Sequence, residues 1–327
     1  MKDIGIDLGT ANVLVYVKGQ GIVLNEPSVL AIDSETKNVL AVGKDANEML
    51  GRTPGKVKAT KPLKDGVIAD FEYTEAMLTN MLKKVKGLRL WSKPRILICC
   101  PSNITPVEKN AIKEAAEKLG AKKVFMEEEP KVAALGAGMD ISKPGANMVI
   151  DIGGGTTDIA ILSLGGIVNS SSVKIAGNTF DNAIIEYIRE KYKLLIGERT
   201  AEEIKLNLGT VYKGDKGNKR EIKGRSLENG LPNTIEISEK EVEEALYPHA
   251  LKIIKETKKV LEETSPELSA DIVDKGIVLT GGGALVKGFT ELFEKELSVP
   301  IFIAESPLTC VAEGCGVMLS NLNLLDR

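Results

Sequence analysis

The sequence predicts an α/β protein made of two duplicated lobes. Three observations predict this architecture. The chain has 327 residues, 43% of them hydrophobic, which is more than one ordinary core accommodates. Apolar strand patterns alternate with helical patterns along the chain. One strand–turn–strand pattern also occurs twice, about half a chain apart.

The repeated pattern links residues 4–23 (IGIDLGTANVLVYVKGQGIV) to residues 148–168 (MVIDIGGGTTDIAILSLGGIV). In each segment an apolar strand ends in Asp, and Gly, Thr, a second apolar run and a closing Ile-Val follow. β-Branched residues within the runs and glycines between them are typical of two strands joined by a tight turn. The shared order therefore predicts two related lobes that face each other.

A β–α–β unit occupies the middle of the first lobe. A strand at Arg95–Cys100 precedes a helix over residues 105–119, which has Pro106 just inside its start and Gly120 just after its end. A second strand follows at 123–126. The apolar residues of this segment roughly follow helical spacing; they are Val107, Ile112, Ala115, Ala116 and Leu119.

The second half of the chain continues the alternation. Helices are predicted over 179–195 and 238–263, and a strand at Ile277–Thr280 runs into three glycines. Residues 213–237 are charged and glycine-rich with short strand-like runs. This composition predicts a small peripheral sheet.

Composition excludes several classes of protein. With 43 basic and 46 acidic residues, the net charge of −3 indicates no nucleic-acid partner, and 4% aromatic residues provide no stacking platform for single strands. No apolar run approaches the roughly 20 residues of a membrane span, and the start of the chain enters a strand without a signal peptide.

Cys99 and Cys100 would point to opposite faces of a strand, so we expect reduced, buried thiols in a cytosolic protein.

Three glycine-containing loops carry the chemistry: residues 7–12 (DLGTAN), 151–158 (DIGGGTTD) and 280–284 (TGGGA). Glycine turns let backbone N–H groups approach phosphate oxygens, and an Asp at a strand end can hold Mg²⁺ through water. The first two loops would clamp a magnesium–triphosphate between the lobes, and the third suits close passage over a base. The P-loop and GxGxxG patterns are both absent.

Other polar residues allow two interpretations each. The acidic run Glu127–Glu129 before Pro130 is a solvated helix start, or Glu129 lies at the mouth of the lobe and positions water for attack on a phosphate. Glu202 and Lys205 share a helix face, either as a surface ion pair or as ribose and base contacts. In the loop 87–94 (GLRLWSKP), Trp91 either packs in the core or anchors the chain to anionic lipid.

At this point the motifs resemble a known family. In their order, DLGTAN, DIGGGTTD and LTGGGA look like the actin/Hsp70/sugar-kinase superfamily, and longer segments such as TPGKVKATKPLKDGVIADFE and IGERTAEEIK resemble the bacterial actin family of MreB. LICCPSNIT and EEEPKVAALGAG are closest to its Mbl branch. The resemblance runs from Asp3 to about Leu325.

The resemblance implies an actin-like ATPase fold with two RNase H-like lobes and small inserted subdomains IB and IIB. Subdomain IA would comprise 1–32 and 76–140, IB 33–75, IIA 141–180 and 265–327, and IIB 181–264. It also implies ATP and Mg²⁺ in the cleft, with slow hydrolysis coupled to polymerisation.

The family's site residues carry over to positions in this sequence. Its phosphate contacts fall on Thr10, Ala11, Asn12, Gly153, Gly154, Gly155 and Thr156. Its nucleoside contacts fall on Glu202, Lys205, Gly281, Gly282, Gly283 and Ala284. Glu129 would be the catalytic glutamate and Thr156 the water-positioning threonine, while Asp7 and Asp151 would hold Mg²⁺ through water.

The resemblance also implies partners and a location. Family members form antiparallel double protofilaments under the inner membrane and guide cell-wall synthesis with the elongation machinery. The membrane-insertion loop falls on Leu90 and Trp91, within residues 88–93, and the helix 105–119 lies where lateral pairing is expected. Because this chain lacks the N-terminal amphipathic helix of some relatives, the loop is expected to carry more of the anchoring at the cytoplasmic face.

Three other functions share parts of this pattern. A sugar kinase needs an Asp base and room for a sugar, and the inserted segments are small. An Hsp70-like chaperone needs a peptide-binding domain after the ATPase core, which the chain end at Arg327 argues against. A nucleotide-binding scaffold that polymerises without hydrolysis remains open, as does the choice between ATP and GTP.

Overall fold

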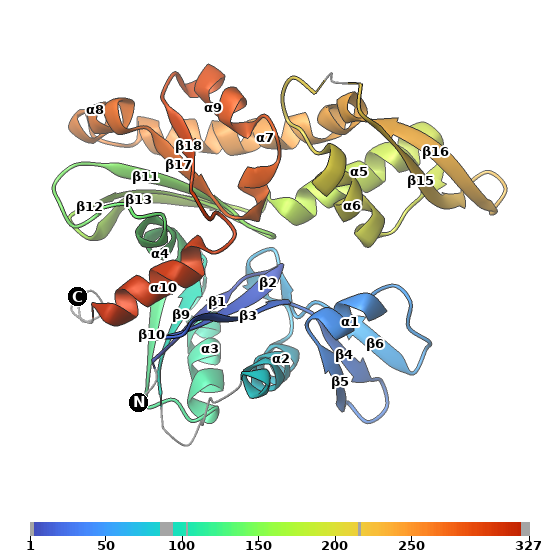
Figure 1. Cartoon of the computed structure of the whole chain (residues 1–327), viewed down its shortest axis with the longest axis horizontal. Helices are drawn as coiled ribbons and strands as arrows, with labels where there is room; N and C mark the ends of the chain where they lie inside the picture. Colours follow the sequence, from blue (N-terminus) through green and yellow to red (C-terminus); the bar gives the residue numbers. More distant parts are fainter. Residues whose placement is uncertain (1–2, 86–93, 103, 215–216, 322–327) are drawn as a thin grey trace.

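The first lobe is built on a five-stranded mixed sheet. A computed structural model describes residues 3–85, 94–102, 104–214 and 217–321. The strand order is β10-β9-β1-β2-β3, in which β1 is antiparallel to β2 and parallel to β9 (Figure 1). The strands are β1 Ile4–Leu8, β2 Asn12–Val17, β3 Gly21–Pro27, β9 Arg95–Cys100 and β10 Lys123–Glu128.

The second lobe repeats this topology. Its sheet has the order β13-β12-β11-β17-β18, with β11 Asn147–Ile152, β12 Thr157–Ser163, β13 Gly166–Val173, β17 Ile277–Thr280 and β18 Ile301–Ile303. Registers match as well: Asp7 pairs with Cys99 as Asp151 pairs with Thr280, each on the parallel neighbour. The predicted duplication of the lobes is therefore confirmed, and both Asp residues lie at equivalent strand ends.

Each lobe contributes one helix that packs on the sheet of the other lobe. Helix α4 (Glu129–Gly136) follows the last strand of the first sheet and packs on β11 and β12 of the second. Helix α10 (Cys310–Ser320) follows β18 and packs on β1 and β2 of the first sheet (Figure 1). The two helices also cross each other, and a Cβ on Gly136 or Gly314 would overlap the backbone of the other helix. Glycine is required at this crossing because the backbones themselves are in contact.

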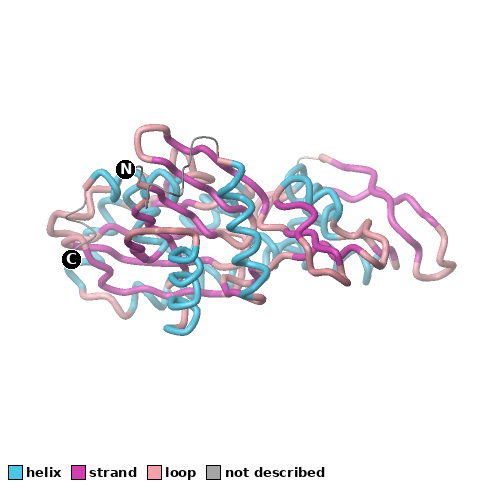
Figure 2. Tube along the Cα trace, turned by 90° about the horizontal axis from the view of Figure 1, so that it is seen from below, coloured by secondary structure: helices cyan, strands magenta, loops and turns pink. Residues whose placement is uncertain are grey.

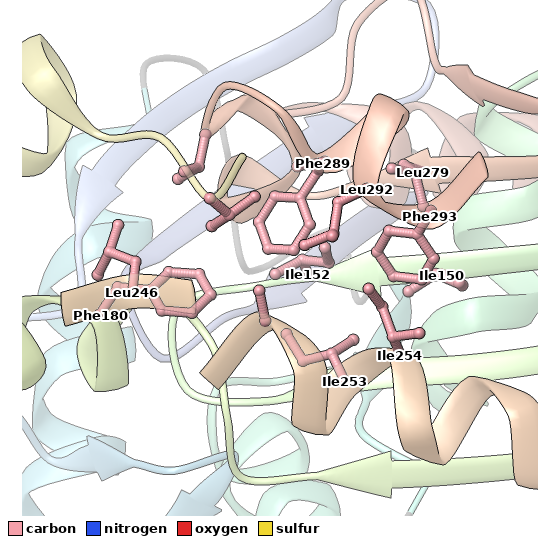
Figure 3. Packing of buried hydrophobic residues seen from close by; sticks show 14 of the residues in the cluster. Ile150, Ile152, Phe180, Leu246, Ile253, Ile254, Leu279, Phe289, Leu292 and Phe293 are labelled. Atoms are coloured by element: carbon pink, nitrogen blue, oxygen red, sulfur yellow. The ribbon is translucent and has the colours of Figure 1, made fainter. Parts of the chain in front are cut away.

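The apolar strand β11 is buried on both faces, which explains its continuous apolar run. Ile150 and Ile152 face a core formed with α5 (Gly177–Tyr192), α7 (Glu239–Glu262) and α9 (Phe289–Leu297), shown in Figure 3. In this core the rings of Phe180 and Phe289 lie 6.0 Å apart. Val149 faces the opposite way, into the cluster that contains residues of α4 and α10. The second sheet is therefore packed between two apolar clusters behind its loops.

Most of the inserted segments form smaller units at one end of the elongated molecule, on the right of Figure 1 and of Figure 2, whereas the turn at residues 65–66 lies against Thr156 of the other lobe. The first contains β4 Leu30–Asp33, β5 Val39–Val42, α1 Lys44–Met49, β6 Val57–Thr60, β7 Leu63–Lys64 and β8 Val67–Ile68, followed by α2 Phe71–Lys84. The second contains β14 Leu194–Leu195, α6 Glu198–Leu208, β15 Lys219–Ser226 and β16 Pro232–Ser238. Helix α8 Pro266–Lys275 and the 3₁₀ turn η2 Gly282–Leu285 belong to the second lobe. The subdomain boundaries stay predictions, and that at residue 32 falls inside β4.

The predicted helix 105–119 is observed as α3, Pro106–Lys118, and a capping box between Thr105 and Glu108 starts it. Of the apolar residues at helical spacing, Ile112, Ala115 and Ala116 are buried, whereas Val107 in the first turn is 78% exposed.

Cys99 and Cys100 enter different core clusters on opposite faces of β9, and the four cysteines are free and buried. No helix in the described ranges is long and apolar enough to cross a membrane.

Candidate nucleotide-binding site

The three glycine loops line one cavity of about 460 Å³ between the lobes. Nearly all residues predicted to bind nucleotide line it: Thr10, Ala11, Asn12, Gly153, Gly154, Gly155, Thr156, Glu202, Lys205, Gly281, Gly282 and Gly283. Ala284 does not line the cavity. It is fully buried in the second-lobe core, because η2 turns its methyl group inward. Asp7, Asp151 and Glu129 also line the cavity.

The first two loops touch each other across the lobes. A Cβ on Gly154 would lie 2.6 Å from the Cβ of Ala11, and one on Gly155 would lie 2.6 Å from Thr10 Oγ1. Any side chain at these positions would push the lobes apart. The glycines thus bring two sets of backbone N–H groups to one place, as anion binding requires.

The N-terminus of α5 adds to this electropositive region. Gly177 and Asn178, the first residues of α5, line the cavity, and their N–H groups bond to the carbonyls of Gly153 and Gly154 at 3.1 and 2.8 Å. The loop is therefore fastened to the helix start. The helix dipole places partial positive charge there, which favours an anionic ligand.

Four carboxylates line the cavity together with the first two glycine loops: Asp7, Asp151, Asp158 and Glu129. Burial raises the pKa of Asp7 to about 7. Burial and the neighbouring charges of Asp158 and Asp7 raise that of Asp151 to about 8. The ion pairs formed by described residues include none of these four carboxylates. A buried acidic cluster without a protein counter-charge is suited to a cation.

The donor set fits hydrated magnesium better than a directly ligated metal. Within the described residues, no group of three or more His, Cys, Asp or Glu is arranged to hold a metal ion directly. Mg²⁺ keeps several of its waters and takes few carboxylates. Asp7 and Asp151, at equivalent strand ends, are placed for such water-mediated contacts.

Glu129 occupies the first position of α4, where Pro130 favours the helix start. Its Oε1 atom is buried without a hydrogen-bond partner. Burial, followed by the charges of Asp158, Asp7 and Asp151, raises the pKa of Glu129 well above its usual range. Glu127 differs, because it forms an ion pair with Lys131 at 3.0 Å. Of these two glutamates, only Glu129 has a free carboxylate oxygen at the cavity.

Residues of α6 and of the third glycine loop line another part of the cavity. Lys205 Nζ lies 2.8 Å from Asp181 Oδ1 and donates to the carbonyl of Gly177 at 3.1 Å. The alternative of a surface ion pair between Lys205 and Glu202 is therefore wrong, since α5 supplies the partner. Glu202 is left facing the cavity.

Sequence reasoning left several lining residues without a role. Asp158 ends the DIGGGTTD motif, so its position could have drawn attention to it. Asp181 and Lys287 are single residues on α5 and after η2, and no local pattern marks them. The predicted membrane residues Leu90 and Trp91 lie outside the described part of the chain.

Comparison with known proteins agrees with this arrangement. The MreB/Mbl protein family matches residues 1–327. The chain is 61% identical over 326 residues to the cell shape-determining protein Mbl of Bacillus cereus, covering 100% of this chain and 98% of that protein. It is 50% identical over 328 residues to the cell shape-determining protein MreB of Escherichia coli, covering 99% and 94%.

Solved structures agree with the fold. MreB5 of Spiroplasma citri bound to AMPPNP superposes with a TM-score of 0.94 at 42% identity, over 98% of this chain and 97% of that one. A MamK double helical filament has a TM-score of 0.83 at 21% identity, over 98% of both chains, which is a likeness of fold. Two duplicated lobes around a glycine-lined cavity define an actin-like protein. The chain belongs to the MreB/Mbl family.

Proposed function

We propose that this protein binds ATP with Mg²⁺ in the interlobe cavity, polymerises into filaments and hydrolyses the nucleotide slowly. The observation that carries the proposal is the meeting of two equivalent Asp-Gly-Thr loops, one from each lobe, at the ends of matching strands. The nucleotide-bound structures of MreB5 from Spiroplasma citri support it.

Each part of the cavity has a role in this proposal. The N–H groups of residues 10–12 and 154–156 would bind the phosphates, with the start of α5 behind them, while the Gly153 N–H donates to the Thr156 carbonyl and closes the loop. Lys205, Glu202 and the glycines 281–283 would contact the nucleoside. Mg²⁺, held through water by Asp7 and Asp151, would neutralise charge on the phosphates.

Hydrolysis would depend on two further side chains. Thr156 would orient the attacking water, and Glu129 Oε1 would accept its proton. Proteins catalyse phosphoryl transfer mainly by positioning the reacting groups and by stabilising charge, so the placement of a base and a water beside the terminal phosphate is a large part of the mechanism. Burial raises the pKa of Glu129, which increases its affinity for that proton.

In the cell, we propose a role in shape determination, as the names of the relatives suggest. Antiparallel pairs of protofilaments would lie on the cytoplasmic face of the inner membrane and organise the cell-wall elongation machinery. Helix α3 would take part in lateral pairing, and residues 88–93 would contact the membrane.

The test of the central proposal is polymerisation. The purified protein with ATP and Mg²⁺ is expected to form filaments that pellet and are visible by electron microscopy, with phosphate released on the same timescale. EDTA should prevent both. Filaments without phosphate release would support the non-hydrolysing scaffold instead, and failure to bind ATP at all would overturn the proposal.

The membrane assignment has a separate test. Trp91→Ala is expected to weaken co-sedimentation with anionic vesicles, since an interfacial Trp anchors a loop at the headgroup level. Trp91→Phe, which keeps an aromatic ring, serves as the matched control and should retain most of the binding. If Trp91→Ala binds vesicles as well as the unmodified protein does, the loop is not the anchor.

A further inference from the structure

An ion pair joins the two inserted segments on the solvent side of the cavity. Lys61 Nζ lies 3.1 Å from Glu198 Oε2. Lys61 follows β6 in the segment inserted into the first lobe, and Glu198 is the first residue of α6 in the segment inserted into the second. Arg220 and Glu203, by contrast, pair within the second segment. The Lys61–Glu198 pair therefore connects the two lobes through their insertions.

On the second lobe, Glu198 lies one helical turn before a residue that lines the cavity. Helix α6 contributes Glu202 and Lys205 to the lining, and Glu198 is four positions before Glu202. Residues four apart share one face of a helix. The side chain of Glu198 is 69% exposed. It therefore continues the lining face of α6 from the cavity out to solvent.

On the first lobe, the segment that follows Lys61 is attached to the loops proposed to bind phosphate. The N–H of Gly66, in the turn between β7 and β8, donates to Thr10 Oγ1 at 3.1 Å. A Cβ on Gly66 would lie 2.4 Å from Thr156 Cγ2. Thr10 belongs to the first glycine loop and Thr156 to the second. Lys61 thus precedes a turn that contacts both sides of the cavity.

The lobes are joined differently on the two sides of the molecule. The crossing of α4 and α10 lies on the side away from the inserted segments (Figure 1). At that crossing the two backbones are in contact, whereas the inserted segments meet through two long, partly exposed side chains. Separation of the lobes is therefore easiest at the inserted segments, and it would break the Lys61–Glu198 pair. A nucleotide bound between the glycine loops would leave through that opening.

We propose that the Lys61–Glu198 ion pair closes the mouth of the cavity and slows the release of bound nucleotide. The inference rests on the proposed nucleotide binding. Neither side chain lines the cavity, so neither is placed to act on the phosphates, and the pair affects release instead of chemistry. Opening of such a closure before product leaves is a common limit on turnover. Because the pair is partly exposed, its attraction is modest and is weakened by salt.

The test exchanges the two charges and follows release of a fluorescent ADP analogue during a chase with excess ADP. Glu198→Gln removes the attraction and should speed release about two- to fivefold. Glu198→Lys places two cations opposite each other and should speed it about five- to tenfold. The double variant Lys61→Glu/Glu198→Lys re-forms the pair and should release ADP within about twofold of the unmodified rate. The double variant keeps Lys at the start of α6, so slower release in it cannot come from the helix dipole.

Salt and hydrolysis provide readouts that a purely structural role would not separate. The ratio of the release rates of Glu198→Gln and the unmodified protein should fall toward one at about 1 M salt, because screening removes the same attraction. Single-turnover hydrolysis at saturating ATP should stay within about twofold in every variant, as for side chains outside the reaction. Lys56→Glu, which reverses an exposed charge of the same inserted segment, is the control and should leave release unchanged.

The outcomes distinguish this inference from the proposed function. Absence of nucleotide binding in the unmodified protein would overturn the proposed function and this inference with it. If nucleotide binds, the inference alone is overturned when Glu198→Lys releases ADP at the unmodified rate. It is also overturned when the double variant stays as fast as Glu198→Lys, or when Lys56→Glu speeds release equally.

Discussion

Glu129→Ala is expected to bind ATP normally and to release phosphate more slowly by a factor on the order of 10²–10⁴. The reason is that Oε1 of Glu129 is the buried, unpartnered carboxylate oxygen that can take the proton of the attacking water. Glu129→Gln should behave similarly, because it keeps the size of the side chain and removes its basicity. The measurements are phosphate release at saturating ATP and nucleotide binding by fluorescence.

Glu127→Gln is the matched control for this prediction. Glu127 belongs to the same acidic run but is occupied by the ion pair with Lys131 and does not line the cavity. Loss of the Glu127 charge should leave the rate of phosphate release within about twofold of that of the unmodified protein, because this side chain takes no part in the reaction. Unchanged hydrolysis in Glu129→Ala would remove Glu129 from the mechanism and would favour the non-hydrolysing scaffold or another base.

Gly314→Ala is expected to lower the free energy of unfolding by about 3 kcal/mol or more. A Cβ at this position would overlap the carbonyl oxygen of Val132, and backbone cannot move aside as a flexible side chain can. Helices α4 and α10 would have to separate at their crossing, where each also packs on the sheet of the other lobe. Urea denaturation, followed by circular dichroism, measures the change.

A control substitution and a double variant test this prediction further. Gly55→Ala adds the same methyl group where no other atom lies within 4 Å, so its effect should stay within about 0.5 kcal/mol. Gly136→Ala should resemble Gly314→Ala, and the double variant should cost less than the sum, because one separation of the helices accommodates both methyl groups. A loss below about 0.5 kcal/mol for Gly314→Ala would mean that the crossing is looser than the structure indicates.

Much of the fold could be predicted from local patterns. The two hairpins, the β–α–β unit around α3 and the strand at Ile277–Thr280 were each predictable, since strand alternation, turn glycines and helix caps are encoded within a few residues. The equivalence of Asp7 and Asp151 was also visible, because duplication preserves the order of residues within each hairpin.

Several features depend on contacts between distant segments and could not be predicted from local patterns. Val107 fits the helical period, yet the direction from which the sheet packs on α3 leaves it exposed. Lys205 pairs with Asp181 on α5 instead of with Glu202, and Ala284 turns into the core although the three preceding residues line the cavity. No window of sequence contains both partners of such contacts.

The sequence by itself determined the two lobes, the three glycine loops and the strand-end carboxylates, because each depends on short-range backbone geometry. Only the tertiary structure decided how closely the lobes approach, that α4 and α10 cross through Gly136 and Gly314, and that Asp158 reaches Ser102. These features depend on close packing between residues far apart in the chain, and such packing is determined by the shapes of all the contacting side chains together.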